Sequence, residues 1–215
     1  MKLLVIGASG KTGHEVVRQA LAAGHEVTAF VRDPTRLAVR DARLSITTGD
    51  ARNTDDLRRA LQGQDAVIAT LGGRPRQVLV DRLRGRPDHI MERSTTALVA
   101  AASEAGVRRV VLLSTFMLAE NFRAGILTPI IAFYRPMNDD KRAGEQALRR
   151  SQLDWTIVYA TRLTDGQRSG RERLVPATET VTARNAVSRA DVAAFLLAQI
   201  NKETSIGECV VLTAT

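Results

Sequence analysis

The chain has 215 residues, of which 44% are apolar and 25% are charged. This composition is typical of a globular protein and excludes the disordered and fibrous classes, and at roughly 150 residues per domain the length predicts one domain. The only cysteine, Cys209, excludes an intramolecular disulfide and an all-cysteine metal site, and the three histidines lack the spacing of metal ligands, so we expect no metal.

In chain order, short apolar segments alternate with helical patterns. The apolar segments are rich in β-branched residues, as is typical of parallel strands buried on both faces. They predict strands at residues 2–6, 26–31, 44–48, 66–70, 109–113, 155–159 and 208–212. Capping and periodicity signals predict helices at residues 11–23, 54–61, 91–105, 140–150 and 188–200. This alternation predicts an α/β protein with a single-domain, Rossmann-type, doubly wound parallel sheet.

Two segments interrupt the alternation. Residues 116–137 contain Pro129 and Pro136, and residues 166–185 are polar and rich in Thr and Arg. Each segment follows the carboxyl end of a predicted strand, which is where ligands bind in open α/β sheets. We therefore expect one domain over residues 1–215, with a small C-terminal substrate region and with these two segments as the walls of the substrate site.

The net charge of +8 raises the question of a nucleic-acid partner. The basic residues are mostly scattered, and aromatic residues, at 4%, are too few for base-stacking platforms. An anionic small molecule explains the sign equally well, so we expect a small-molecule substrate and no nucleic acid. No apolar run approaches the roughly 20 residues of a membrane-spanning helix, and the N-terminal run is too short for a secretory signal. We expect a cytoplasmic monomer or dimer without membrane contact.

A glycine-rich loop joins the first predicted strand to the first predicted helix. Its sequence is Gly7-Ala8-Ser9-Gly10-Lys11-Thr12-Gly13, with the spacing G-x-x-G-x-x-G. The first glycine permits a tight turn, the second lets the backbone approach a pyrophosphate, and the third lets helix and strand pack closely. The helix N-terminus adds unpaired N–H groups and a positive potential. The loop predicts a dinucleotide site, and a tight turn without a ligand is the alternative.

The end of the second predicted strand distinguishes the two nicotinamide dinucleotides. An NAD site usually carries an acidic side chain there for the ribose hydroxyls, whereas this chain has Arg32, with Arg36 four residues on and Lys11 in the glycine loop. Three cations suit the 2′-phosphate of NADP, so we expect NADP(H) as the cofactor. The alternative is that Asp33 binds the ribose and that both arginines are solvated.

Seven segments of the chain resemble the atypical short-chain dehydrogenase/reductases, in the NAD(P)H-binding, NmrA-like subgroup that includes biliverdin-IXβ/flavin reductase. The segments are VIGASGKTG, AGHEVTAFVRDPTRL, GDARN, QDAVIATLGG, GVRRVVLLST, SQLDWTIV and VSRADVAAFLL. They extend over most of the chain and are specific to a fold and a cofactor. They are not specific to one reaction.

The resemblance implies a set of cofactor contacts. The phosphate loop would comprise Gly7, Ser9, Gly10, Lys11, Thr12 and Gly13, and Arg32 and Arg36 would contact the 2′-phosphate. Asp50 and Ala51 fall at the adenine, and Leu71, Gly72 and Gly73 fall beside the ribose and pyrophosphate. The alternatives are a helix-start or turn role for Asp50 and a simple turn at Gly72-Gly73.

The expected reaction centre departs from the family pattern. Ser114 and Thr115 end the fifth predicted strand, where the resemblance implies a catalytic or orienting hydroxyl, and hydrogen bonds to strand-end backbone are the alternative. The usual acid of the family is the Tyr of Y-x-x-x-K. Lys141 matches the Lys, but Met137 occupies the Tyr position. Lys141 then has three readings: a member of a catalytic pair, a structural or ribose-binding residue, or a surface ion pair with Glu145 at i+4.

Two tyrosines are candidates for a relocated acid. Tyr134 lies one helical turn before Met137, but Arg135-Pro136 disfavour a continuous helix between them. Tyr159 stands in the sixth predicted strand, just before the position where relatives commonly carry a proline that this chain lacks. It is expected to line the pocket or offer a proton, with ordinary core packing as the alternative.

Together these residues predict an NADPH-dependent oxidoreductase that transfers a hydride to a small conjugated or aromatic acceptor, such as a flavin or a quinone. The protein binds and orients the reactants, while the cofactor carries the chemistry. One alternative is an NADP-binding redox sensor without turnover, which the missing acid favours. The other is a redox-neutral isomerase, dehydratase or cyclase that uses the same fold.

Overall fold

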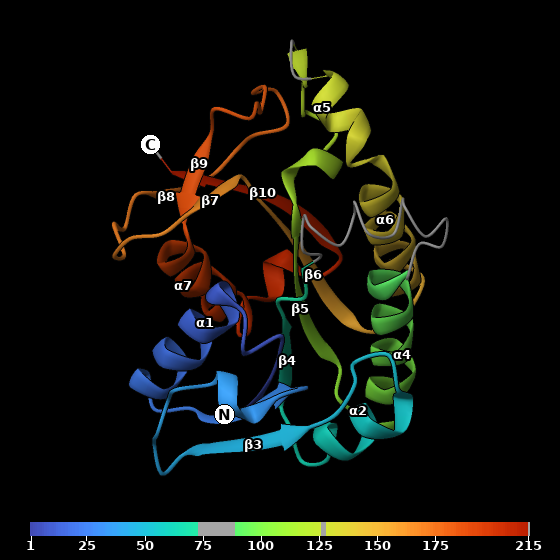
Figure 1. The fold of residues 1–215 in the computed structure, drawn as a ribbon, viewed down its shortest axis with the longest axis vertical. Helices are drawn as coiled ribbons and strands as arrows, with labels where there is room; N and C mark the ends of the chain where they lie inside the picture. The colour runs from blue at the N-terminus through green and yellow to red at the C-terminus, as the bar shows by residue number, and fades with distance from the viewer. Residues whose placement is uncertain (73–88, 126–127, 215) are drawn as a thin grey trace.

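An eight-stranded sheet forms the centre of the computed structural model, which describes residues 1–72, 89–125 and 128–214 (Figure 1). Its strands are β1 Lys2–Ile6, β2 Glu26–Val31, β3 Leu44–Thr48, β4 Ala66–Ala69, β5 Arg109–Thr115, β6 Asp154–Ala160, β8 Glu172–Leu174 and β10 Glu208–Ala214. Their order is β3-β2-β1-β4-β5-β6-β10-β8. All neighbours are parallel except β8, which is antiparallel to β10. The predicted Rossmann-type sheet is confirmed.

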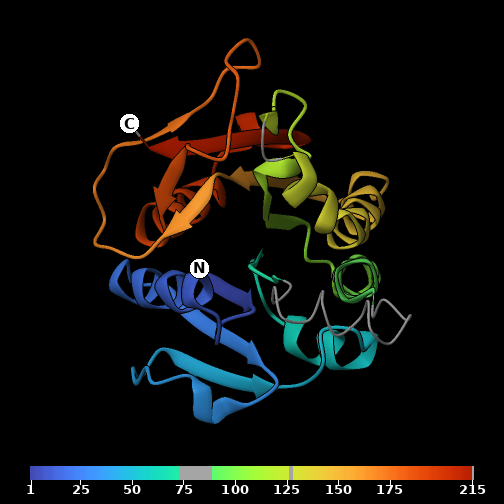
Figure 2. The ribbon, with the colours of Figure 1, turned by 45° about the horizontal axis from the view of Figure 1, so that its top comes forward.

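Helices cover both faces of this sheet. α1 (Lys11–Ala22) and α7 (Arg189–Gln199) lie side by side on one face, and α2 (Thr54–Leu61), α4 (Ile90–Ala105) and α6 (Arg135–Arg149) lie on the other (Figures 1 and 2). The alternation of a strand divides its side chains between two cores. On β1, Leu3 and Val5 pack with α1 and α7, whereas Leu4 and Ile6 pack with α2 and α4.

The observed elements differ from the predicted ones at the periphery. β3 is not buried on both faces, because it is the edge strand and only the short 3₁₀ helix Pro34–Arg36 lies between it and β2 in sequence. Its Ile46 is 43% exposed. Three strands of three residues each were not predicted, because a period of two cannot be recognised over so short a run. They are β8 and the pair β7 (Arg162–Thr164) and β9 (Ala186–Ser188), which form a separate two-stranded sheet.

α6 begins earlier than its predicted start at residue 140. It starts at Arg135, and Pro136 lies in the first turn, where the helix needs no N–H from it. Tyr134 is the N-cap residue between α6 and the short helix α5 (Thr128–Phe133). The expected interruption of the helix between Tyr134 and Met137 is therefore present. Pro136 lies in the first turn of the second helix, α6, and does not end the first one.

Two contacts fix α6 against α4. The Asp140 carboxylate accepts hydrogen bonds from the backbone N–H groups of Met91 (3.0 Å) and Glu92 (2.9 Å), so a side chain of one helix caps the N-terminus of the other. A Cβ on Gly144 would lie 2.8 Å from the Met91 carbonyl oxygen and 2.9 Å from Thr95 Oγ1, so this close approach requires a glycine. The side chains of α6 are thereby held at a defined depth.

The two irregular segments are joined to each other. Phe122 forms a β-bridge with Val181, and the Asn121 amide donates to the carbonyl oxygens of Pro176 (3.3 Å) and Glu179 (2.8 Å). Residues 119–123, which follow the 3₁₀ helix Phe116–Leu118, and residues 174–181 thus form one connected cover. Their role as substrate walls remains a prediction.

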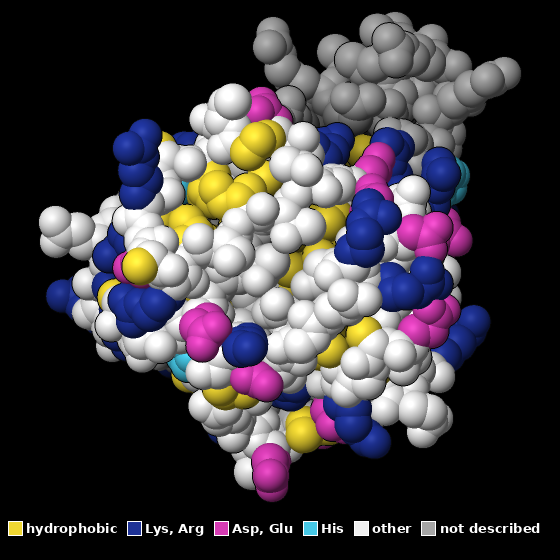
Figure 3. Space-filling view, turned by 90° about the horizontal axis from the view of Figure 1, so that it is seen from below, with side chains coloured by type: hydrophobic (Ala, Val, Ile, Leu, Met, Phe, Trp, Pro, Cys, Tyr) yellow, Lys and Arg dark blue, Asp and Glu magenta, His cyan; other side chains and the backbone are white. Residues whose placement is uncertain are grey.

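On the face seen in Figure 3, Lys and Arg side chains are interspersed with Asp and Glu side chains. Such a distribution gives no continuous basic stripe on that face for a polyanion to follow. In the described ranges, no helix is both long enough and apolar enough to cross a bilayer.

Candidate active site

The glycine loop between β1 and α1 has the backbone conformation that a phosphate cradle requires. Gly7 has a φ of +82°, in the left-handed region that favours glycine. A Cβ on Gly13 would lie 2.2 Å from the Gly7 carbonyl oxygen, so α1 can start this close to β1 only because residue 13 has no side chain. Gly10 is the N-cap of α1 and makes no side-chain cap, which leaves the first helix amides available to an anion. The loop fits a dinucleotide pyrophosphate.

Lys11, in this loop, is paired with the segment that follows β7. Its Nζ lies 2.7 Å from Asp165 Oδ2, and Asp165 Oδ1 accepts a hydrogen bond from Arg189 at 2.6 Å. The hydrogen bond from Lys11 and the nearby Arg189 hold the pKa of Asp165 below its usual value. A cavity of about 360 Å³ lies here, lined by Gly10, Lys11, Asp165 and Arg189 among others. Lys11 is thus already engaged and is not a third free cation beside Arg32 and Arg36.

Arg32 and Arg36 follow β2 and are exposed. Neither lies within ion-pair distance of a carboxylate in the part of the chain that the structure describes. Asp33, between them, accepts hydrogen bonds from Thr35 Oγ1 (2.6 Å) and Thr35 N (3.0 Å), and both lower the pKa of Asp33. One oxygen of Asp33 is therefore hydrogen-bonded within the turn that follows β2. The guanidinium groups of Arg32 and Arg36 can bind an anion.

Asp50 lies in the loop after β3 and is held by Arg52. The guanidinium Nη2 is 2.6 Å from Asp50 Oδ2, and these hydrogen bonds lower the pKa of Asp50 to about 2. The end of β2 lies beside this loop, because Gly49 N donates to the Val31 carbonyl oxygen at 3.1 Å, and the nearby Arg32 lowers the pKa of Asp50 further. Ala51 follows Asp50 directly. The carboxylate is ionised at neutral pH, and its expected contact with adenine remains a prediction.

The remaining cofactor positions follow β4. Leu71 and Gly72 come directly after Thr70, whose hydroxyl donates to the carbonyl oxygen of Ile6 at 3.1 Å. β4 and the glycine loop are thereby tied together at the carboxyl end of the sheet. The predicted contacts of Leu71 and Gly72 are untested, and Gly73 lies outside the described residues.

The two hydroxyls at the end of β5 have different partners. Ser114 is buried, and its Oγ donates a hydrogen bond to Glu145 Oε1 at 2.5 Å. Thr115 Oγ1 accepts from Met117 N at 3.4 Å and caps the following 3₁₀ helix. Thr115 therefore makes a hydrogen bond to backbone at the strand end, which was the alternative to a catalytic role. Ser114 is instead hydrogen-bonded to a buried carboxyl group.

The surface ion pair considered for Lys141 and Glu145 is absent, because neither side chain is at the surface. Lys141 is 8% exposed and Glu145 is 4% exposed, since α6 packs this side against α4 and the sheet. Burial lowers the pKa of Lys141, and the charge of Glu145 opposes that shift. Met137 lies one turn before Lys141 and is half-buried. Met137 and Lys141 thus lie one turn apart on α6, and the match of Lys141 to the lysine of Y-x-x-x-K remains a prediction.

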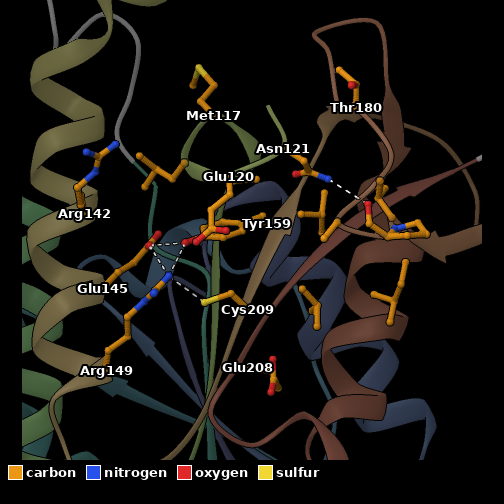
Figure 4. Close-up of a pocket in the computed structure, with 18 of the residues that line it drawn as sticks. Met117, Glu120, Asn121, Arg142, Glu145, Arg149, Tyr159, Thr180, Glu208 and Cys209 are labelled. Atoms are coloured by element: carbon orange, nitrogen blue, oxygen red, sulfur yellow. Dashed lines mark hydrogen bonds and ion pairs between the residues drawn. The ribbon is translucent and has the colours of Figure 1, made fainter. Parts of the chain in front are cut away.

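Tyr159 belongs to a buried network around Glu145 (Figure 4). Its hydroxyl donates to Glu145 Oε2 at 2.7 Å and accepts from Arg149 Nη2 at 3.0 Å, and the same Nη2 lies 2.9 Å from Cys209 Sγ. Burial, together with Glu145, raises the pKa of Tyr159. Sequence reasoning missed Glu145, Arg149 and Cys209 as members of a site. The only available signal was the i, i+4 spacing of Lys141, Glu145 and Arg149 along α6.

A cavity of about 1150 Å³, which we call the groove, lies beside this network. Strands β6 and β10 line one side, α6 lines another, and residues 117–123 and 174–180 contribute from the two irregular segments. Met117, Arg142, Glu145, Arg149, Tyr159 and Cys209 are among its lining residues (Figure 4). Among the described residues, those of the glycine loop do not line it. Glu145 is therefore in contact both with the groove and with Ser114 at the end of β5.

Comparison with known proteins assigns the class that this fold and loop define. A sequence profile described as NAD(P)H-binding matches residues 7–203, and the chain belongs to that family. It is 34% identical over 156 residues to a (4-alkanoyl-5-oxo-2,5-dihydrofuran-3-yl)methyl phosphate reductase of Streptomyces griseus, an alignment that covers 73% of this chain and 46% of that protein. The chain spans about half the length of this relative.

Two solved structures show the same fold. A short-chain dehydrogenase/reductase of Veillonella parvula in complex with NADP superposes with a TM-score of 0.78 at 20% identity, covering 98% of this chain and 93% of that one. An anaerobillin reductase of Escherichia coli O157:H7 superposes with a TM-score of 0.76 at 22% identity, covering 99% and 96%. The expected resemblance and the NAD(P)H cofactor are confirmed, and the expected oxidoreductase class agrees with the family.

Proposed function

We propose that this protein is an NADPH-dependent reductase that transfers a hydride to a small conjugated or aromatic acceptor, such as a flavin or a quinone. One observation carries the choice of acceptor. α6 carries Lys141 at the position that matches the family's lysine, one turn before the Glu145 that contacts Ser114 of β5, but Met137 stands at the position of the proton-donating tyrosine. Acceptors that delocalise negative charge depend least on such an acid. The name of the Escherichia coli structural relative, an anaerobillin reductase, is consistent with a conjugated acceptor.

The residues of this chain would hold the cofactor in three places. The amides of residues 11–13 would face its pyrophosphate, Arg32 and Arg36 would face the 2′-phosphate, and Asp50 would face the adenine. When bound, the nicotinamide supplies the hydride. Ser114, Thr115 and Lys141 then stand at the reacting end, with the groove and its Tyr159 nearby. The expected cytoplasmic location belongs to this proposal.

Assays of NADPH oxidation also test the two alternative functions, a redox sensor and a redox-neutral enzyme. A redox sensor would bind NADPH but oxidise none of it with any acceptor. A redox-neutral enzyme would show full activity without added nucleotide. Oxidation of NADPH that depends on a flavin or a quinone contradicts both, and this comparison is the direct test of the proposal.

The preference for NADPH over NADH rests on Arg32 and Arg36. A hydrogen bond to a charged group contributes about 1.5–3 kcal/mol, so Arg32→Ala should weaken NADPH binding by about 10- to 100-fold and leave NADH binding nearly unchanged. Titration of nucleotide fluorescence measures both affinities. Arg18→Ala is the matched control, because it removes the same charge from an exposed position on α1. Equal affinities of the unmutated protein for the two nucleotides would contradict the preference.

The role of the strand-end hydroxyls is tested by removing each one. If Ser114 orients the acceptor, Ser114→Ala should lower turnover by about 10- to 100-fold while NADPH affinity stays the same. Thr115→Val removes the cap of a 3₁₀ helix and should act mainly on stability, by about 1 kcal/mol. Ser103→Ala, on the exposed side of α4, is the control. Unchanged turnover in both variants would leave these residues with strand-end packing alone.

A further inference from the structure

We infer that Glu145 relays the proton of the reduction from the groove to Ser114, an inference that rests on the proposed function. Glu145 is 4% exposed and each of its oxygens contacts a different hydroxyl: Oε1 lies 2.5 Å from Ser114 Oγ and Oε2 lies 2.7 Å from Tyr159 OH. Burying a carboxyl group is costly, and this one is offset by two hydroxyls that donate to its two oxygens, a pair of contacts that an amide with a single accepting oxygen could not make. A carboxyl group in this position can also gain and lose a proton.

Glu145 lies between the end of β5 and the groove. On one side it contacts Ser114, the second-last residue of β5, at the carboxyl edge of the sheet, which is the edge that carries the glycine loop. On the other side, Glu145, Tyr159 and Arg149 line the groove, whose volume of about 1150 Å³ holds many water molecules (Figure 4). Met137 cannot give the proton that a tyrosine at its position would give. Because Glu145 contacts both the groove and Ser114, it offers a path for a proton from the groove to β5.

The step balances in protons and electrons. A hydride from the cofactor would leave the acceptor in need of one proton on a heteroatom. Ser114 breaks its Oγ–H bond to give that proton, and Oγ forms a new O–H bond with the proton of Glu145 Oε1. The observed contact runs from Ser114 to the carboxylate, and the same contact runs in reverse when Glu145 is protonated. The carboxylate that remains then takes a proton from water in the groove.

Neighbouring charges suit a group that alternates between these two states. The charged and titratable groups that face Glu145 or share its side of the groove are Lys141, Arg142 and Arg149 of α6, Tyr159 of β6, Cys209 of β10 and Glu120 of the cover. Arg149 Nη2 lies 4.0 Å from Glu145 Oε2, close enough to stabilise the carboxylate after it has given up its proton. The raised pKa of Tyr159 keeps its hydroxyl protonated, so that it donates to Glu145 in both states.

The first test uses the protein without nucleotide. Infrared difference spectra between acidic and alkaline pH should contain the carbonyl band of a protonated buried carboxyl group, shifted in D₂O, that disappears in Glu145→Gln. Tyr159→Phe should move the band, and Gln146→Ala, which alters a neighbouring lining residue, should leave it in place. If no band depends on Glu145, the residue does not exchange a proton and the relay is wrong.

The second test compares acceptors. A general acid is typically worth 10²–10⁴-fold, and its contribution grows with the basicity of the reduced product. Glu145→Gln should therefore slow the reduction of a conjugated aldehyde by about 100-fold, of a quinone less, and of free flavin by no more than about threefold. It should also leave NADPH affinity unchanged.

Each outcome of this comparison decides one question. An equal loss with all three acceptors, together with a lower free energy of unfolding, would make Glu145 a structural tie and overturn the relay. A protein that exchanges the proton of Glu145 but oxidises NADPH with no acceptor would instead overturn the proposed reductase function. A graded loss with an unchanged free energy of unfolding supports the relay.

Discussion

With saturating NADPH, this protein is expected to reduce a free flavin or a quinone at least 100-fold faster than an unactivated aliphatic ketone. Reduction of a ketone develops negative charge on one oxygen, and a positioned general acid is typically worth 10²–10⁴-fold for that step. With Met137 at the tyrosine position, the side chains at the end of β5 that can give a proton are the aliphatic hydroxyls of Ser114 and Thr115, which are weaker acids than a phenol beside a lysine. Flavins and quinones delocalise the charge and depend less on that acid.

One assay makes this comparison. The absorbance of NADPH is followed at equal concentrations of free flavin, a quinone and an unactivated ketone, with the rates in the absence of protein subtracted. Installing the missing phenol provides a matched variant, since Met137→Tyr should raise the ketone rate more than the flavin rate. Faster turnover of the ketone by the unmutated protein would refute the expectation and point to Tyr134 or Tyr159 as a relocated acid.

Adding one methyl group to Gly13 is expected to abolish NADPH binding. The new Cβ would lie 2.2 Å from the Gly7 carbonyl oxygen, 2.8 Å from the Gly7 carbonyl carbon and 2.8 Å from Thr70 Oγ1. Two of these atoms belong to the backbone of the phosphate loop, so the loop or the start of α1 must move. Overpacking of this kind costs about 1–3 kcal/mol, and the displaced amides no longer converge on the pyrophosphate.

Urea unfolding and nucleotide titration of Gly13→Ala measure both effects. Gly10→Ala in the same loop is the control for the stability measurement alone, because its Cβ would meet a single atom, the Gly7 carbonyl oxygen, at 3.2 Å. The control should lose less than about 1 kcal/mol of stability. If Gly13→Ala bound NADPH as tightly as the unmutated protein, the loop would not be the phosphate site.

The parts of the structure that could be predicted from the sequence are those with local signals. The glycine loop, the run of β-branched strands and the helix caps each depend on a few adjacent residues, and so the order and type of the main elements follow from them. The start of α6 could not be predicted from the sequence, because the effect of Pro136 depends on its position. A proline interrupts a helix when it lies in the interior and favours a helix when it lies in the first turn. Only the fold decides between them.

The Glu145 network could not be predicted, because its members meet only through the fold. Ser114 and Glu145 are 31 residues apart, and Arg149 and Cys209 are 60 residues apart. Along α6 alone, Lys141, Glu145 and Arg149 have the spacing of an exposed ion-pair ladder, which is the commoner use of that pattern. Lys141 and Glu145 are instead buried, which could not be predicted because it depends on the packing of α6 against its neighbours in the fold.

The cap that Asp140 places on α4 makes the start of that helix a reporter for the candidate site. The first amides of an isolated helix exchange rapidly with solvent, whereas those of Met91 and Glu92 are bonded to Asp140 of α6. Any event that shifts α6, whether a ligand in the groove or a change at Glu145, alters the protection of these two amides. Hydrogen exchange at residues 91 and 92 can therefore record the position of α6 without a bound substrate.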